Sequence, residues 1–309
     1  MLKPLLLTAG LLFLCFPSVR AQSPRFNAAA RQTEKLIADS GADVGIALHS
    51  LDGRTEWFFH ADEPFHAAST MKLPVMIELF HQVKEGKLRL EDPLVIRNEF
   101  HSIADGSVFK LDPAVDSETD LYQAEGQTRT LLQLCERMIT VSSNLATNLL
   151  IEKLGVENIR ATVHSYGANG MNVLRGVEDD KAFDKGMNNT TTARGLEVLL
   201  AAIAEGKMVD TASSRRMVEI LEQQKFNEGI PAGLPPGTRV AHKTGEITKI
   251  HHDAAIVYAK RPYVLVVLVR GIQDEKVSAK LIADISATLY PVAESLPEGT
   301  KSVAEGNLP

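Results

Sequence analysis

Ser69, Thr70, Met71 and Lys72 form the first group of residues that could do covalent chemistry. Helix positions three residues apart share a face, so the Ser69 hydroxyl and the Lys72 amine can meet. A serine hydroxyl needs a nearby base to become a nucleophile, and a lysine can be that base if burial lowers its pKa. The start of a helix would also favour a developing oxyanion at Ser69. The apolar helix that predicts this burial contains Leu73, Val75, Met76, Ile77, Leu79 and Phe80.

The same spacing has a plainer interpretation. Ser69 could simply cap a helix, and Lys72 could extend its ammonium group to solvent. A second copy of the pattern runs from Ser107 to Lys110, but it lies in a polar stretch with no apolar helix after it. The Ser-x-x-Lys spacing alone therefore leaves both interpretations of Ser69 open.

Ser142, Ser143 and Asn144 form a second polar group, between the apolar helical runs 131–139 and 145–154. This position predicts a tight turn between two helices, with short polar side chains projecting from it. A hydroxyl there could relay a proton, and an amide could hold a substrate carbonyl. The alternative is that the triplet only caps the second helix.

Lys243, Thr244 and Gly245 form a third group, at the end of an alternating strand that begins at Arg239. The lysine and the threonine could bind a substrate carboxylate. The glycine would let a ligand backbone approach the strand edge closely. The alternative is an exposed strand end, where these residue types are common.

The elements that must position these groups follow from the hydrophobic periodicity. Residues 24–40 predict an opening helix, and the runs 44–51 and 55–60 predict a hairpin about Asp52 and Gly53. Residues 69–204 are mostly helical, with a polar, turn-rich insertion at 97–126. Strands are predicted at 239–244, 254–258 and 264–269, and a last helix at 274–289.

Strands at both ends and helices in the middle predict a mixed fold, α/β plus all-α. An antiparallel sheet, flanked by the N- and C-terminal helices, would carry an inserted helical domain. We assign 22–62 and 226–293 to the sheet part, 63–225 to the helical part and 294–309 to a flexible tail. A site is then expected between the two parts.

Residues 1–21 predict a removable secretory signal, with Lys3 before an apolar run and small residues at Val19 and Ala21. The 309-residue chain has a net charge of −6, which becomes −8 without this segment. That charge disfavours nucleic acid and anionic membranes as partners. Only Cys135 would remain, which excludes an internal disulfide and predicts a buried thiol. We expect an exported monomer, periplasmic or secreted, with no membrane contact after cleavage.

In this order, the three groups match the Ser-x-x-Lys, Ser-x-Asn and Lys-Thr-Gly motifs of class A β-lactamases and penicillin-binding proteins, motifs that general compilations of catalytic patterns record. The chain resembles this superfamily over most of its length. The resemblance extends beyond the motifs to residues 64–70, 142–150, 190–193 and 230–235.

The resemblance implies a role for each residue. Ser69 would attack the substrate carbonyl, Lys72 would act as base or proton relay, and Ser142 would pass a proton to the leaving nitrogen. Asn144, Lys243, Thr244 and Gly245 would bind the substrate. The backbone N–H groups of Ser69 and Glu246 would form the oxyanion hole.

One segment departs from the class A pattern. Class A enzymes carry Glu-x-x-Leu-Asn on a loop, and its glutamate activates the water that releases the acyl group. Here Glu178 is the candidate, but Lys181 and Ala182 replace the Leu-Asn pair, and Arg175 lies one residue further away than usual. Glu178 could instead be a surface carboxylate paired with Arg175.

The sequence therefore leaves three candidate functions open. The first is a β-lactamase that confers antibiotic resistance, and the second is a D-alanyl-D-alanine peptidase that acts on peptidoglycan stem peptides. The third is a sensor that β-lactams acylate without turnover. No cofactor is expected. A metal site is not expected either at His242, His251, His252 and Asp253, because adjacent strand residues point to opposite faces.

Overall fold

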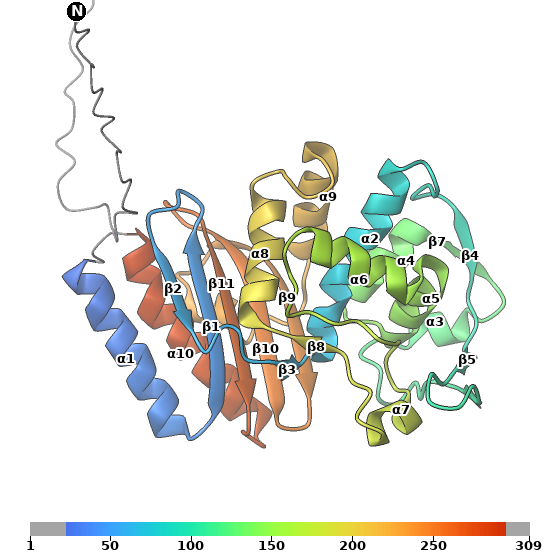
Figure 1. Ribbon diagram of the computed structural model, residues 1–309, viewed down its shortest axis with the longest axis horizontal. Coiled ribbons are helices and arrows are strands. Elements are labelled where there is room, and N and C mark those ends of the chain that lie inside the picture. Colours follow the sequence, from blue (N-terminus) through green and yellow to red (C-terminus); the bar gives the residue numbers. More distant parts are fainter. Residues whose placement is uncertain (1–22, 295–309) are drawn as a thin grey trace, which may run out of the picture.

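A computed structural model describes residues 23–294. The predicted signal segment and nearly all of the predicted tail lie outside these residues. Within them, one five-stranded antiparallel sheet has the strand order β2-β1-β11-β10-β9 (Figure 1). Its strands are β1 (Asp43–Ser50), β2 (Glu56–Phe59), β9 (Arg239–Ile247), β10 (Ile250–Tyr258) and β11 (Tyr263–Arg270).

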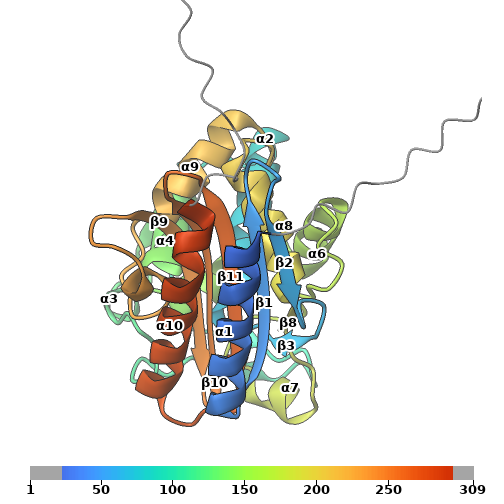
Figure 2. The same ribbon diagram turned by 90° about the vertical axis from the view of Figure 1, so that its left-hand side faces the viewer.

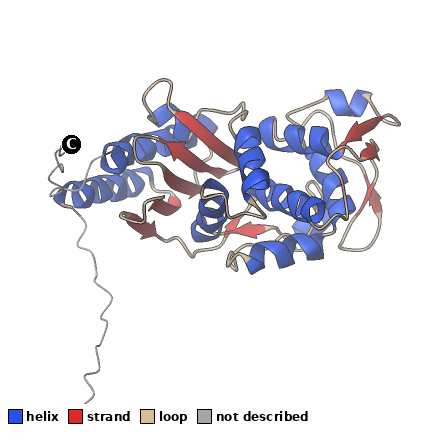
Figure 3. Ribbon diagram, turned by 90° about the horizontal axis from the view of Figure 1, so that it is seen from above, coloured by secondary structure: helices blue, strands red, loops and turns tan. Residues whose placement is uncertain are grey.

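The sheet is buried on both faces because helices cover each of them. Helices α1 (Pro24–Ser40) and α10 (Glu275–Glu294) lie side by side on one face (Figure 2). Alternate residues of β11 point to this face, namely Tyr263, Leu265, Val267 and Val269. Val264, Val266 and Leu268 point to the other face and join the core of the helical region. Figure 3 shows the strands between the two sets of helices.

The helical region packs against the second face of the sheet, mainly through α8. Its longer helices are α2 (Lys72–Lys84), α4 (Leu131–Thr140), α5 (Asn144–Leu154), α6 (Val156–Ser165), α8 (Ala193–Ala204) and α9 (Thr211–Leu221). Its short elements are β3 (Phe65–His66), η1 (Ala68–Met71), β4 (Pro93–Val95), β5 (Phe100–His101), β6 (Val108–Phe109), α3 (Asp120–Gln123), β7 (Thr128–Thr130), α7 (Asp180–Asp184) and β8 (Thr190–Thr191). The short turn η2 (Ile230–Gly233) packs instead against α10.

The antiparallel sheet with terminal helices and an intervening helical region confirms the predicted fold class. The exact domain boundaries stay a prediction. The opening helix and the hairpin about Asp52 and Gly53 form as expected. Among the described residues, no helix is both long enough and apolar enough to cross a membrane.

The β9–β10 hairpin corrects one predicted boundary. The sequence placed a strand end at Thr244, but β9 continues to Ile247 and pairs with β10 down to Ile250. The chain reverses through Thr248 and Lys249, and Lys249 has a φ of 62°. These two residues lack the glycine or asparagine that marks most two-residue turns, so no sequence pattern indicated the longer hairpin.

Candidate active site

Ser69 lies in the 3₁₀ turn η1, which leads directly into α2. Backbone hydrogen bonds hold the turn, from Ala67 N to Asn189 O at 2.8 Å and from Thr70 N to Ala67 O at 3.0 Å. Ala68 has a φ of 44°, a left-handed conformation that costs a non-glycine residue about 1–2 kcal/mol. Met71 precedes α2 at its N-cap, so the alternative that Ser69 caps this helix is wrong.

Lys72 is completely buried, so the alternative that its ammonium reaches solvent is also wrong. Its Nζ donates hydrogen bonds to Ser142 O at 2.6 Å, Ser142 Oγ at 3.1 Å and Asn144 Oδ1 at 2.8 Å. Burial lowers the pKa of Lys72 to about 7, although Asp116 and Glu178 oppose that shift. The amine is therefore poised between its charged and neutral forms near neutral pH.

The structure brings Lys72 to Ser142 and Asn144 rather than to the Ser69 hydroxyl. An ammonium group has three donors, and the three hydrogen bonds to Ser142 and Asn144 use all of them. None of the hydrogen bonds within residues 23–294 joins Lys72 Nζ to Ser69. When Lys72 is neutral, its lone pair becomes available to accept a proton.

Ser142 lies at the N-terminal end of α5 and has a left-handed φ of 56°. Its Oγ accepts hydrogen bonds from two lysines, Lys72 at 3.1 Å and Lys243 at 3.2 Å. The hydroxyl proton of Ser142 is therefore free to be donated elsewhere. The capping interpretation applies to the neighbour, because Ser143 is the N-cap of α5 and accepts from Ala146 N.

Asp116 contacts the site, although no sequence pattern pointed to it. Its carboxylate accepts hydrogen bonds from the backbone N–H groups of Asn144 and Leu145 and from the Tyr122 hydroxyl. An anion at this end of α5 also interacts favourably with the helix dipole. Asp116 lies in the polar insertion, and no motif spacing links it to Asn144, so only the folded chain reveals the contact.

Lys243 is completely buried within β9, which rules out the exposed strand end. Its Nζ donates to Ser142 Oγ and to Thr244 O at 2.8 Å. Burial first, and then the charge of Lys72, lower the pKa of Lys243 well below its ordinary value of 10.5. Two buried lysines therefore converge on one hydroxyl oxygen, and the charge of Lys72 disfavours that of Lys243.

Gly245 lets β9 lie directly against the turn that carries Ser69. A Cβ at this position would lie 3.0 Å from Ser69 N and 2.9 Å from Thr70 N. This close approach brings Glu246, the next residue of β9, to the same pocket as Ser69. Burial and the neighbouring Glu275 carboxyl raise the pKa of the Glu246 side chain to about 7.

Glu178 is brought to the site, on the loop between α6 and α7. Its Oε1 accepts from Asn144 Nδ2 at 2.7 Å and its Oε2 accepts from Asp112 N at 3.2 Å. Burial raises the pKa of Glu178 above its ordinary value. Its φ of 59° is left-handed, as is often found where the fold holds a residue for function.

The residues at the positions of the missing Leu-Asn pair do not support Glu178. Lys181 turns outward and donates to Asp105 Oδ2 and Ser107 Oγ, while Ala182 is buried. Neither side chain offers an amide beside Glu178. Arg175 does not pair with Glu178 either, because its guanidinium donates to Met187 O, Gly176 O and Asn188 Oδ1.

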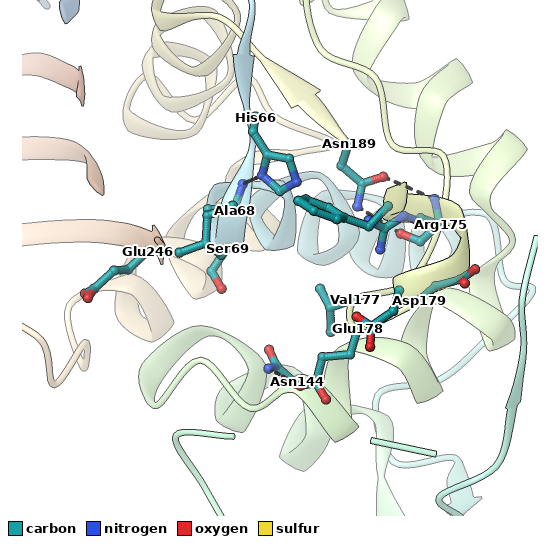
Figure 4. Close-up of a pocket in the computed structure, with 13 residues that line it drawn as sticks. His66, Ala68, Ser69, Asn144, Arg175, Val177, Glu178, Asp179, Asn189 and Glu246 are labelled. Atoms are coloured by element: carbon teal, nitrogen blue, oxygen red, sulfur yellow. Dashed lines mark hydrogen bonds between the residues drawn. The ribbon is translucent and has the colours of Figure 1, made fainter. Parts of the chain in front are cut away.

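One pocket, with a volume of about 210 Å³, is lined by four of the predicted site residues (Figure 4). Ser69 and Glu246 border it from η1 and β9, and Asn144 and Glu178 border it from α5 and the loop before α7. The full lining is His66, Ala68, Ser69, Asn144, Arg175, Val177, Glu178, Asp179, Asp180, Phe183, Asn189, Glu246 and Ile247. The arrangement can place a carbonyl against a serine, with a carboxylate nearby.

Other sequence candidates lie elsewhere or have structural contacts. Ser107, of the second Ser-x-x-Lys copy, lies on the short β5–β6 hairpin and donates to Asp105. His242 contacts Asp253 Oδ1 at 2.9 Å inside the sheet. Cys135 is a free, buried thiol, as expected, and burial raises its pKa.

Comparison with known proteins identifies the family. The model of the β-lactamase enzyme family matches residues 28–293. The extended-spectrum β-lactamase PER-1 of Pseudomonas aeruginosa is 25% identical over 306 residues, which cover 94% of each chain. The β-lactamase ROB-1 of Haemophilus influenzae is 25% identical over 256 residues, covering 81% of this chain and 79% of that one.

Solved structures agree with this result. PBP-A superposes with a TM-score of 0.75 at 28% identity, over 87% of this chain and 97% of that one. A β-lactamase from Sphaerobacter thermophilus gives a TM-score of 0.74 at 25% identity, over 88% and 99%. Because the family match spans nearly all of the described residues, the chain belongs to the β-lactamase enzyme family and is a hydrolase.

Proposed function

We propose that the protein is a serine β-lactamase that opens the β-lactam ring through an acyl-enzyme on Ser69. One observation carries this proposal. Ser69 and Glu178 line the same pocket, and the buried Lys72, whose pKa is about 7, is bonded to Asn144 in its wall. A nucleophile, a base and a second carboxylate are the groups that a two-step acyl transfer needs.

In the acylation step, the Ser69 oxygen attacks the β-lactam carbonyl carbon and the ring C–N bond breaks. Neutral Lys72 takes the hydroxyl proton and passes a proton to Ser142 Oγ, while Ser142 gives its own proton to the leaving nitrogen. The shared contacts of Lys72 and Lys243 with Ser142 Oγ support this relay. The N–H groups of Ser69 and Glu246 bind the oxyanion, while Lys243, Thr244 and Asn144 hold the substrate.

In the deacylation step, Glu178 takes a proton from a water molecule, whose oxygen attacks the ester carbonyl. The Ser69–carbonyl bond then breaks and the proton returns to Ser69. The hydrogen bond from Asn144 Nδ2 to Glu178 Oε1 supports this role, because it holds the carboxylate at the pocket. A general base of this kind contributes about 10²–10⁴-fold.

A time course of the protein with a penicillin, followed by intact-protein mass spectrometry, tests the assignment. Ser69→Ala should abolish the adduct, while the matched variant Ser107→Ala should form it normally. Glu178→Gln should acylate quickly but hydrolyse its adduct ~10²–10⁴-fold more slowly. An adduct on Ser107, or one that persists in Ser69→Ala, would overturn the nucleophile assignment.

The second candidate function is a D-alanyl-D-alanine peptidase that β-lactams acylate durably. The outward turn of Lys181 favours it, because no amide from that position helps Glu178 hold a water. A PBP-A variant has been solved as an acyl-enzyme complex with penicillin G. If the wild-type protein accumulates the adduct and Glu178→Gln changes nothing, this candidate replaces the β-lactamase proposal.

We further propose that the protein is exported to the periplasm or the medium, acts as a monomer and contributes to antibiotic resistance. The support is the signal-like segment 1–21 together with the family membership. Expression in a susceptible bacterium, with N-terminal sequencing of the periplasmic protein and measurement of the inhibitory penicillin concentration, tests all but the oligomeric state. Light scattering of the purified protein tests that.

A further inference from the structure

His66 contacts the strained turn that carries the nucleophile. The residue belongs to β3, pairs with Thr190 of β8 and lines the active-site pocket. Its Nδ1 lies 3.1 Å from Ala68 N and accepts a hydrogen bond from it. Ala68 is the left-handed residue immediately before Ser69. This single side-chain contact therefore holds the backbone at the point where strain is stored.

The hydrogen bond also fixes the tautomer of His66. Because Nδ1 accepts, a neutral ring carries its proton on Nε2. That atom is buried and has no hydrogen-bond partner among the residues the structure describes. Burial, and then the nearby Arg175, lower the pKa of His66, so the ring is neutral at pH 7. A protonated ring could not accept from Ala68 N.

His252, on β10, holds His66 from the other side. Its Nδ1 accepts from Val269 N at 3.1 Å, so its Nε2 carries the proton and donates to His66 O at 2.9 Å. Burial lowers the pKa of His252 to about 4, which keeps this ring neutral as well. A continuous chain of hydrogen bonds thus runs from the central strand β11 to the turn before Ser69.

We propose that His66 is a positioning residue for the nucleophile, and that His252 fixes His66 in place. By holding the Ala68 N–H, His66 sets the direction of the next peptide unit, which carries the Ser69 amide. That amide is one donor of the proposed oxyanion hole, so this inference rests on the proposed acyl transfer at Ser69. A donor that is misplaced by about 1 Å costs ~10²-fold in rate.

Three variants of His66 separate its proposed positioning role, the hydrogen bond from Ala68 N, from a role in packing beside Phe183. His66→Asn keeps an acceptor where Nδ1 lies but leaves space beside Phe183, whose ring centroid lies 6.0 Å from that of His66. His66→Phe fills the space but has no acceptor. His66→Gln carries its acceptor further along the side chain, away from Ala68 N. Positioning predicts that Asn is the best replacement, whereas packing predicts that Phe is.

The measurement is the rate constant of acylation by a fluorescent penicillin at saturation, together with the concentration for half-maximal rate. We expect His66→Phe and His66→Gln to acylate ~10²-fold more slowly. His66→Asn should stay within ~10-fold of wild type, and the half-maximal concentration should hardly change in any variant. Melting temperatures show whether each variant folds, and if His66→Phe does not, the comparison of Asn with Gln decides.

Failure of the proposed function and failure of the inference about His66 give different results. If wild-type protein takes no label, the proposed function fails, and the inference about His66 fails with it. If wild-type protein is labelled but His66→Phe or His66→Gln is labelled as fast as His66→Asn, only the inference about His66 is overturned.

Discussion

Two buried lysines share the Ser142 hydroxyl, and burial is the physical basis of the proposed base, Lys72. Neither Lys72 nor Lys243 has a direct ion pair, because each donates to oxygens of serine, threonine or asparagine. Desolvation of this kind disfavours the charged amine and lowers its pKa. Asp116 and Glu178 act from a greater distance and only moderate the effect on Lys72.

The first prediction concerns the pH dependence of acylation. Lys72 is protonated below its pKa of about 7 and neutral above it, and only the neutral amine can accept the Ser69 proton. In Glu178→Gln, residue 178 no longer titrates and no longer raises the pKa of Lys72, so the acylation rate should fall about tenfold for each pH unit below a midpoint under 7 and level off above it. Stopped-flow measurement with a chromogenic cephalosporin gives this profile.

Lys72→Arg is the matched variant for this prediction. It keeps a cation but cannot lose its proton in this range, so its acylation should be slow at every pH, by ~10² or more. Lys35→Arg, at an exposed position on α1, should behave as wild type. An acylation rate in Glu178→Gln that does not fall at any pH below 7 would show that Lys72 is not the base.

The sequence motifs named the candidate site residues but not the partners that hold them. Ser69, Ser142 and Lys243 belong to short motifs that can be read from the sequence alone. Asp116 and His66 act through contacts with residues on other elements or in other turns, and these contacts depend on the tertiary fold. The helical spacing put Lys72 near Ser69, but it could not show that Ser142 and Asn144 take all three donors.

At the scale of elements, α5 and the loop before α7 are joined by Asn148. This buried side chain accepts from Val177 N at 2.7 Å and donates to Val177 O at 3.0 Å. It therefore binds the residue before Glu178 as a neighbouring strand would. Since Glu178 itself has a left-handed φ, the loop needs such an anchor to keep the carboxylate at the pocket.

The second prediction is that Asn148→Ala slows deacylation more than acylation. Loss of both hydrogen bonds frees Val177 and lets Glu178 leave the pocket, whereas Ser69 and Lys72 lie on other elements. We expect hydrolysis of the adduct to slow by ~10-fold or more, towards the Glu178→Gln value. Single-turnover mass spectrometry separates the two steps. Asn158→Ala on α6, which removes a hydrogen bond to Leu154 O at the end of α5, is the control.

A result in which Asn148→Ala slows both steps equally would mean that the whole of α5 has shifted. The sequence could not foresee this anchor. Asn148 lies inside an apolar helix, and the segment 142–150 was recognised only as similar to the family. The path of residues 175–184 decides which loop the Asn148 amide faces. That segment departs from the class A pattern.

Over the whole molecule, the site depends on a sheet buried on both faces. The continuous apolar run of β11 predicted a strand, since strands covered on both sides lack a polar face. The order of the strands could not be read from the same run. It places β9 at an edge, where Gly245 can reach the turn at Ser69. Both predicted terminal helices, α1 and α10, support the sheet from the opposite face.

The last prediction tests how tightly the layer formed by α1, α10 and η2 is packed. Gly233, at the end of η2, lies directly against α10, and a Cβ there would come within 2.1 Å of Ala283 O and 2.8 Å of Ala287 N. These atoms belong to the helix backbone and cannot move alone. Gly233→Ala should therefore displace η2 or α10, and overpacking of this kind costs about 1–3 kcal/mol of unfolding free energy, occasionally more.

Gly237→Ala is the matched control, because Gly237 has open space around it and only its φ of 83° is unfavourable. That substitution should cost about 1 kcal/mol. In a chain of this size, each kcal/mol lowers the melting temperature by roughly 2–4 °C, so calorimetry resolves the two variants. Acylation by penicillin should stay normal in folded Gly233→Ala, because η2 does not line the pocket. Equal melting temperatures for the two variants would show that α10 yields to the added methyl group and that the layer is loosely packed.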